Sequence, residues 1–347
     1  MTGLPSPPAP GFTGAVDLTR DDLARDAPPQ DAPPQDAPPQ DAPPQDAPPQ
    51  DVVEPGGVSW EVPVTPGAEL VPIPRPPAEP HDDGGVRTGD VDGWGRSERV
   101  RALARRLYDP VYRRYFRVEW EGLEHIPREG GALLVANHGG AIPSDAPVIM
   151  HGIEAELARP VYGLADNLFR SLPVVGTLWS RAGGVPAHPD NAFRLLHDEQ
   201  QLVLVFPEGT KGTGKLVGER YQLRRFGRGG FVEIAMRAGV PIVPIAVVGN
   251  EEAMPILAKS SRLAKLLNVP YMPLTANMFL FGPIGGLIMP LPAKFKLRVL
   301  PPVHFDVATN QDRYNHSVVL DESEAIRTKI QDALFDMLRA RRSVWSG

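Results

Sequence analysis

The sequence predicts an α/β domain with a largely parallel central sheet flanked by helices. Apolar segments of strand length alternate with segments of helical period between residues 131 and 342. Two of the apolar segments, 131–137 and 202–206, run directly into loops that contain glycine and charged residues. Open α/β sheets bind ligands at such carboxyl strand ends. The 347 residues are enough for one large domain or two smaller ones, and we expect a single domain.

The N-terminal part of the chain differs sharply in composition from the rest. Residues 1–95 hold 22 of the 41 prolines and carry 17 acidic but only 4 basic side chains. Residues 26–50 are five copies of Asp-Ala-Pro-Pro-Gln. Two prolines in five residues exclude helices and sheet ladders, and only alanine is available to bury. We therefore predict a disordered, acidic, proline-rich tail over 1–95, either a spacer or a tolerated expansion, and a folded domain over 96–347.

The first expected element of the domain is a helix over residues 97–118. Apolar side chains recur in it at helical spacing, and many arginines lie between them. Pro110 should kink or break this helix. Two interpretations stay open, a surface helix packed on the core and a basic helix at a membrane interface. The apolar positions are Val100, Leu103, Leu107, Val111, Tyr115 and Val118.

The remaining elements follow in alternation. The expected strands are 131–137, 160–165, 184–186, 202–206, 242–248 and 296–303. The expected helices are 145–153, 173–181, 191–200, 229–238 and 321–342. Residues 270–293 are apolar but rich in proline and glycine, so we do not expect a helix there. This segment could line a pocket, dip into lipid or belong to an irregular part of the core.

Charge and cysteine content restrict the function. Residues 96–347 carry 32 basic and 25 acidic side chains, which favours an anionic partner such as a phosphate compound or a membrane surface. We expect no nucleic-acid partner, because no recognition module is evident. The absence of cysteine excludes disulfides and cysteine metal sites. Without a signal peptide or a long apolar run, we expect a cytoplasmic protein, peripheral at the inner face of a membrane.

A histidine and an aspartate follow the strand over 131–137. His138 stands in a glycine turn, and Asp145 comes seven positions later. A carboxylate that holds an imidazole at a strand end makes a general base. Asp145 could also cap the helix that follows, and one carboxylate can do both. Because no Gly-x-Ser-x-Gly turn surrounds Ser144, we expect the substrate to supply the nucleophile, for example a hydroxyl group.

The loop after Phe206 combines glycines with cations. Such a loop binds anions, phosphates in particular, although it could be merely a solvated basic surface. Residues 209–215 match Gly-x4-Gly-Lys, but Leu216 stands where a nucleotide-binding loop needs Ser or Thr, which argues against an NTPase. The basic residues are Lys211, Lys215, Arg220, Arg224, Arg225 and Arg228.

These segments together resemble the glycerolipid acyltransferase family, whose members acylate glycerol 3-phosphate or lysophosphatidate. The resemblance covers about residues 97–310, and four blocks occur in order. They are Asn137-His138 with Asp145, then residues 183–191 (Gly-Gly-Val-Pro-Ala-His-Pro-Asp-Asn), residues 206–211 (Phe-Pro-Glu-Gly-Thr-Lys) and residues 240–245 (Val-Pro-Ile-Val-Pro-Ile).

The resemblance implies a metal-free acyl transfer without a covalent acyl-enzyme. His138 would deprotonate a lipid hydroxyl, with Asp145 holding its ring, and the hydroxyl would attack the thioester of acyl-CoA or acyl-carrier protein. No cofactor is implied beyond this co-substrate. Expected partners are the lipid acceptor, the thioester donor and an anionic membrane surface. Residues expected at the substrate are Asn137, Gly139, His188, Glu208, Gly209, Thr210, Lys211, Lys215 and Arg228.

Three departures from the family pattern bear on the acceptor. Six residues separate His138 from Asp145, where four are usual. Lys211 replaces the usual arginine, which loses bidentate geometry, and His188 stands near the place of an acceptor-binding arginine. The longer spacing is similar to members that acylate neutral acceptors such as diacylglycerol. A thioesterase or lipid hydrolase, in which His138 activates water, and a non-catalytic lipid-binding protein are the alternatives.

Overall fold

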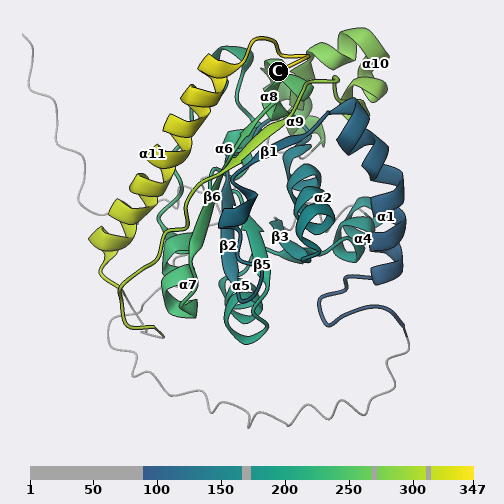
Figure 1. Cartoon of the computed structure of the whole chain (residues 1–347). Coiled ribbons are helices and arrows are strands. Elements are labelled where there is room, and N and C mark those ends of the chain that lie inside the picture. The colour runs from purple at the N-terminus through teal and green to yellow at the C-terminus, as the bar shows by residue number, and fades with distance from the viewer. Residues whose placement is uncertain (1–88, 166–172, 268–271, 310–313) are drawn as a thin grey trace, which may run out of the picture. The chain divides into compact units, whose positions relative to one another are not determined.

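The computed structural model describes residues 89–165, 173–267, 272–309 and 314–347 (Figure 1). The repeats and the rest of residues 1–88 lie outside the described residues. At the start of the described chain, Ser97 Oγ donates a hydrogen bond to Asp90 (2.6 Å) and Tyr162 OH donates one to Asp92 (2.7 Å). Contacts with the domain therefore begin before residue 96, and the division of the chain at that residue stays a prediction.

A mostly parallel sheet forms the centre of the described domain. Its strand order is β1-β9-β6-β2-β5-β3-β4. The five strands from β6 to β4 run parallel to one another, β9 is antiparallel to β6, and β1 is parallel to β9. All six predicted strands are present, and β1 was not predicted. The bounds are β1 Glu119–Glu121, β2 Ala132–Ala136, β3 Val161–Ala165, β4 Gly184–Pro186, β5 Leu202–Val205, β6 Ile242–Val248 and β9 Lys296–Val299.

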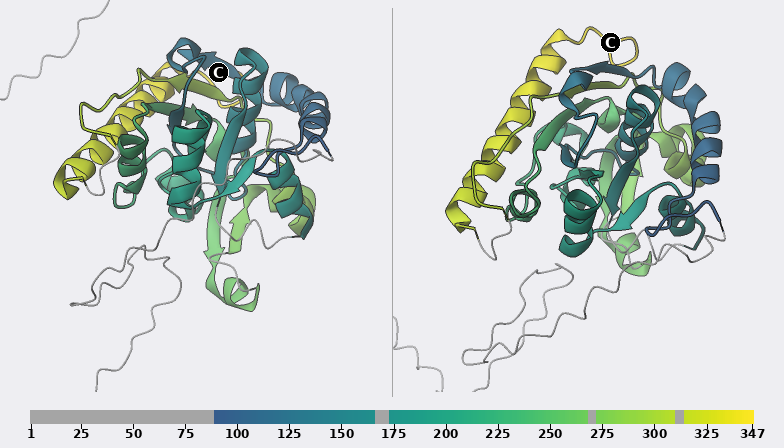
Figure 2. Two further views of the ribbon diagram at one scale, coloured as in Figure 1. Left: turned by 90° about the horizontal axis from the view of Figure 1, so that it is seen from below. Right: turned by 60° about the horizontal axis from the view of Figure 1, so that its bottom comes forward.

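Helices cover both faces of this sheet. Figures 1 and 2 show α7 and α11 on one side and α1, α2 and α4 on the other. The longer helices are α1 Glu98–Pro110, α2 Asp145–Leu157, α4 Pro173–Arg181, α7 Gly230–Ala238, α9 Ser261–Leu267, α10 Ala276–Ile288 and α11 His316–Ala340. Shorter turns are α5 Pro189–Phe193, α6 Thr210–Thr213, α8 Asn250–Ala253, the 3-10 turns Leu123–His125 and Val217–Glu219, and the π turns Val111–Tyr115 and Arg194–Asp198.

The strand β2 explains why the sheet is covered on both sides. All five of its residues are buried. Leu133 and Val135 point into the cluster beneath α7 and α11, whereas Leu134 and Ala136 point into the cluster beneath α2. Because side chains alternate along a strand, a continuous apolar run must be covered on both faces. The same apolar run therefore predicts a central position for β2, the strand that leads to His138.

The helix α1 departs from its predicted apolar stripe. Leu103 and Leu107 are exposed, whereas Arg101 is buried and pairs with the carboxylate of Glu154 on α2. Burial and neighbouring arginines lower the pKa of Arg101 to about 10. At Pro110 the α-helical pattern ends and a π turn over Val111–Tyr115 continues the chain, as expected where a proline removes a hydrogen bond.

The prediction of no helix in residues 270–293 was wrong. Strand β8 (Met272–Thr275) pairs with β7 (Ile256–Ser260), and the helix α10 follows directly. Two short helical stretches make up α10, separated by Gly282 with φ 74° and ψ 172°. Pro283 then stands at the start of the second stretch, where its missing N–H costs nothing. The glycine and proline that argued against a helix are the residues that divide it.

Candidate active site

Three loops meet at the carboxyl edge of the sheet. They follow the adjacent strands β2, β5 and β6, and they begin with Asn137, Phe206 and Gly249. The ends of β2 and β5 are in register, since Val135 lies opposite Val205, whereas β6 continues from Ile245, the partner of Ala136, to Val248. This edge collects the histidine, several carboxylates and one buried lysine described below.

His138 and Asp145 are in direct contact. Nδ1 of His138 lies 3.1 Å from both Oδ1 and Oδ2 of Asp145. The carboxylate is fully buried, whereas 13% of the histidine side chain is exposed. A buried carboxylate that accepts the Nδ1 proton fixes the tautomer and leaves the lone pair on Nε2. The predicted pair is therefore assembled with one ring nitrogen held and the side chain of His138 only partly buried.

The six residues between them form a loop that brings the two side chains together. Gly140 adopts φ 84°, a left-handed conformation that suits glycine. Next to it, the Ala141 amide donates to the carbonyl of Met254 (3.2 Å). The longer spacing is thus accommodated by a turn fastened to the segment after α8, and Ile142 is left exposed at its tip.

Asp145 is held by more than the imidazole. Its carboxylate accepts hydrogen bonds from the amides of Gly139 (3.1 Å) and Ala146 (2.8 Å) and from Asn250 Nδ2 (3.2 Å). The bond from Ala146, in the first turn of α2, shows that the carboxylate also satisfies a helix N-terminal donor. Three donors besides the histidine therefore hold the carboxylate of Asp145 in place.

Two neighbours fix the histidine from other directions. The ring of Phe206 stacks on the His138 ring with centroids 4.1 Å apart and planes inclined by 21°. Asn137 is fully buried, donates from Nδ2 to the Val247 carbonyl (3.0 Å) and accepts from the Val247 amide (2.7 Å). The side chain of Asn137, predicted at the substrate, instead fastens the end of β2 to β6.

Glu208 is also part of the scaffold. Its carboxylate is buried and accepts the backbone amides of His138 (3.1 Å) and Arg224 (2.8 Å). It therefore ties the β5 loop to the histidine from behind. This position does not fit the predicted direct contact of Glu208 with an acceptor, because its oxygens are turned to the protein.

Lys215 lies in the same buried cluster. Its Nζ is 2.8 Å from Glu251 and 3.3 Å from Glu208, and 1% of its side chain is exposed. Burial raises the pKa of Glu251 to about 7, although Lys215 acts in the opposite direction. A lysine enclosed by two carboxylates is not presented to a ligand, which does not fit its predicted role in binding phosphate.

The remaining predicted residues lie nearer to the surface, with one exception. Gly209, Thr210 and Lys211 are exposed where α6 begins, and Arg228 is exposed before α7. Gly139 is buried. A methyl group on it would lie 2.3 Å from Cγ of Glu251, so a larger residue would not fit there. His188 caps α5 by accepting from the Asp190 amide (3.2 Å), at the end of β4, the last strand of the sheet.

Comparison with known proteins identifies the group to which this site belongs. A family profile described as acyltransferase matches residues 117–248, which span the strands β1 to β6. An uncharacterized protein of Mycobacterium tuberculosis is 38% identical over 265 residues, 75% of this chain and 73% of that protein. The chain belongs to the acyltransferase family.

Two more distant similarities are with a mammalian enzyme and with a bacterial protein of known structure. The DGAT1/2-independent enzyme synthesizing storage lipids of Bos taurus is 24% identical over 232 residues, 65% of this chain and 66% of that enzyme. The 1-acyl-sn-glycerophosphate (LPA) acyltransferase PlsC from Thermotoga maritima is similar in structure, with a TM-score of 0.45 at 19% identity, covering 71% of this chain and 84% of that one. The present protein is an acyltransferase.

The sequence analysis did not include the residues after β6 among the candidates for this site. Asn250 contacts Asp145, and Glu251 contacts both Lys215 and the Tyr221 amide (3.2 Å). The signal was available, since residues 249–252 (Gly-Asn-Glu-Glu) come directly after a seven-residue buried strand beside β2. Polar residues at the end of any strand next to the one that leads to His138 belong among the candidates.

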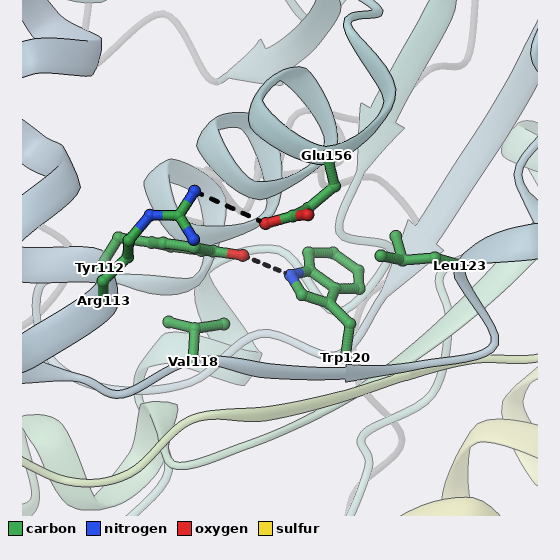
Figure 3. A pocket seen from close by; sticks show the side chains of 6 residues that line it. All are labelled: Tyr112, Arg113, Val118, Trp120, Leu123 and Glu156. Carbon is green, nitrogen blue, oxygen red and sulfur yellow. Dashed lines mark hydrogen bonds and ion pairs between the residues drawn. The ribbon is translucent and has the colours of Figure 1, made fainter.

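A separate pocket of about 400 Å³ lies beside the π turn over Val111–Tyr115, lined by the six residues drawn in Figure 3. In it, Trp120 Nε1 donates to Tyr112 OH (2.6 Å), and Arg113 lies 3.8 Å from Glu156. None of the predicted site residues lines this pocket. Within the described residues, no cluster of three or more histidine and carboxylate side chains is arranged to hold a metal ion.

Proposed function

We propose that this acyltransferase moves a fatty acyl group from a thioester, acyl-CoA or acyl-carrier protein, to the hydroxyl group of a lipid. The observation that carries the proposal is the contact of His138 Nδ1 with both oxygens of the buried Asp145 at 3.1 Å. With Nδ1 held, Nε2 is the nitrogen that can accept a proton. A histidine in this arrangement is a general base of the kind that accelerates a reaction by about 10²–10⁴-fold.

The reaction follows from this arrangement. Nε2 of His138 takes the proton of the acceptor hydroxyl while its oxygen forms a bond to the thioester carbonyl carbon. The tetrahedral intermediate collapses, the carbon–sulfur bond breaks, and the imidazolium returns the proton to the leaving thiolate. Asp145 stabilises the imidazolium between these steps. The buried cluster of Glu208, Lys215 and Glu251 holds the loops in place and does not touch the reacting atoms.

The acceptor is a glycerolipid of the lysophosphatidate type, or a neutral lipid alcohol such as diacylglycerol. Exposed Lys211 supports the first, because it places positive charge on the loop that follows β5. Burial of Lys215 between two carboxylates supports the second, because it removes one cation from those available to a phosphate. The bovine relative's description as an enzyme synthesizing storage lipids also favours a neutral acceptor.

We further propose that the enzyme acts at the surface of an anionic membrane, on its cytoplasmic face, where both a lipid acceptor and a soluble thioester are accessible. Within the described ranges, no helix combines the length and the apolar character needed to cross a bilayer. Lipid substrates partition into bilayers, so an enzyme acting on them has to reach the interface.

The test is thiol release from palmitoyl-CoA with lysophosphatidate, with diacylglycerol or without acceptor. The variants are His138→Ala and the control His197→Ala, since His197 also pairs through Nδ1 with an aspartate, Asp198 (2.9 Å), but is exposed. We expect acceptor-dependent release that falls by about 10³-fold in His138→Ala and is unchanged in the control. Release that needs no acceptor would indicate hydrolysis, and equal robust release by both variants would remove His138 as the base.

A further inference from the structure

The helix α10 presents an unusually apolar surface. Its 13 residues include no charged side chain. Phe279 is 81% exposed, Ile284 76% and Ile288 68%, and Leu280, Phe281 and Met289 are exposed as well. Scattered exposed apolar residues are normal on a protein, but six large ones within residues 279–289 mark a binding surface.

This surface is held in shape from beneath. Asn277 is fully buried and donates from Nδ2 to the carbonyls of Ala253 (3.1 Å) and Met289 (2.7 Å), which closes both ends of α10 onto the domain. Gly286 packs so closely that a methyl group there would lie 2.3 Å from the backbone of Met278. The two halves of α10 are thus packed against each other, and the outward direction of its apolar side chains is fixed.

The same segment connects α10 with the catalytic loop. The Ala253 carbonyl accepts from Asn277 and from the Leu291 amide (2.6 Å), and the next carbonyl, of Met254, accepts from Ala141 (3.2 Å). Ala141 lies between His138 and Asp145, and its neighbour Ile142 is exposed. A membrane or partner that binds α10 would therefore also lie next to the loop that holds His138 and Asp145.

Positive charge flanks the apolar helix on the side of α1. Tyr115 OH donates to the Pro290 carbonyl (2.7 Å) and Arg117 donates to the Pro292 carbonyl (2.6 Å), which joins the end of α1 and its π turn to the end of α10. The outer face of this helical segment carries exposed residues at helical spacing: Arg99, Leu103, Arg106, Leu107 and Arg114. Apolar side chains beside arginines are the combination that binds anionic bilayer surfaces.

We propose that α10 and the outer face of α1 dock the enzyme onto an anionic phospholipid bilayer, with α10 entering the interface and the arginines contacting headgroups. The docking rests on the exposed surface alone, whereas its purpose, delivery of a membrane lipid to His138, rests on the proposed function. The depth needed is about 5–10 Å, which a helix lying in the interface reaches.

The test is sedimentation of the full chain with vesicles of phosphatidylglycerol and phosphatidylcholine, compared with pure phosphatidylcholine. The variants are Phe279→Ser/Ile284→Ser, Arg106→Glu/Arg114→Glu and the matched control Phe335→Ser, an exposed phenylalanine on α11. We expect the apolar double variant to lose about 10-fold or more in partitioning, because each side chain would leave the interface for water. The charge variant should lose binding only to the anionic vesicles, and the control should match the wild type.

A second measurement separates this docking from the catalytic proposal. Transfer from acyl-CoA to an acceptor dispersed in detergent should be unchanged in Phe279→Ser/Ile284→Ser and should fall only when the acceptor is in vesicles. Equal vesicle binding by wild type and both variants would overturn the docking while leaving the chemistry intact. A lipid-free dimer that dissociates in the apolar variant would assign α10 to a second copy of the chain and overturn it too. Vesicle binding without acyl transfer would retain the docking and reject the function.

Discussion

The loops after β2 and β5 resemble each other in sequence but differ in what they present to the surface. Both leave a buried strand, contain glycines and carry ionisable residues. The β2 loop brings His138 to the edge of the sheet, with part of its ring exposed. The β5 loop turns Glu208 and Lys215 inward and leaves Gly209, Thr210 and Lys211 outside. The comparison shows that charged residues in one glycine-rich loop can have different roles. Some are buried in ion pairs that hold the loop in place, and others are exposed.

Electrostatics explains why the inward residues must occur together. A lysine removed from water needs an opposite charge within contact distance, and Lys215 has two. The two carboxylates in turn come from different loops, after β5 and after β6. The ion pairs therefore join these loops. Glu208 also accepts a hydrogen bond from the backbone amide of His138, so the same ion pairs help to fix the position of His138.

The largest effect expected from breaking this arrangement is on catalysis, through Asp145→Asn. An amide cannot stabilise an imidazolium and can hold the wrong tautomer, so we expect kcat to fall by about 10³-fold or more. Asparagine would also turn an NH₂ group towards the donors on Gly139, Ala146 or Asn250, so a lower melting temperature should accompany the loss. Steady-state kinetics and a thermal melt measure the two effects. A variant with nearly full kcat would show that the pair is structural.

The next largest effect is on stability, through Lys215→Met. Removing the ammonium leaves two buried carboxylates side by side, and losing one partner of a buried pair costs about 3–5 kcal/mol. Urea denaturation measures this change in the free energy of unfolding. Lys211→Met is the matched control on the exposed turn of the same loop, where we expect about 0.5 kcal/mol or less. If the two variants were equally stable, Lys215 would not be part of the scaffold.

The difference between the loops also marks how far the sequence could predict the site. Apolar runs predicted the strands, because a strand that is buried on both faces is apolar along its whole length. The contact between His138 and Asp145 was also predictable, since both lie on one short connection. The inward turn of Lys215 was not, because its partner Glu251 comes from a strand that pairs with β2 only in the folded sheet. Nor did the sequence distinguish α10 from a loop, because Gly282 and Pro283 favour both a break and a helix start.

A smaller effect, on pH dependence, tests whether Glu251 belongs to the buried cluster. Burial raises the pKa of Glu251 from 4.5 to about 7, so the folded state binds its proton more tightly than the unfolded state. The contribution of this residue to stability is therefore greatest below pH 4.5 and falls as the pH rises to about 7, by about 3 kcal/mol in all. The measurement is the unfolding free energy of wild type and Glu251→Gln across this range. Their difference should grow in favour of the glutamine variant as pH rises, and a constant difference would contradict the shifted pKa.

The smallest effect concerns the exposed side of the β5 loop and decides between the two acceptors. If Lys211 meets the phosphate of lysophosphatidate, Lys211→Met removes one exposed charge contact, which we expect to raise KM for that acceptor about three- to tenfold. KM for diacylglycerol should not change, because that lipid has no phosphate. Lys211→Arg is the conservative control, since a guanidinium keeps the charge and adds bidentate geometry, so it should keep or lower KM for lysophosphatidate. If the KM for each acceptor were the same in the wild type and in both Lys211 variants, Lys211 would lie outside the acceptor site. That result would favour a neutral lipid alcohol as the substrate.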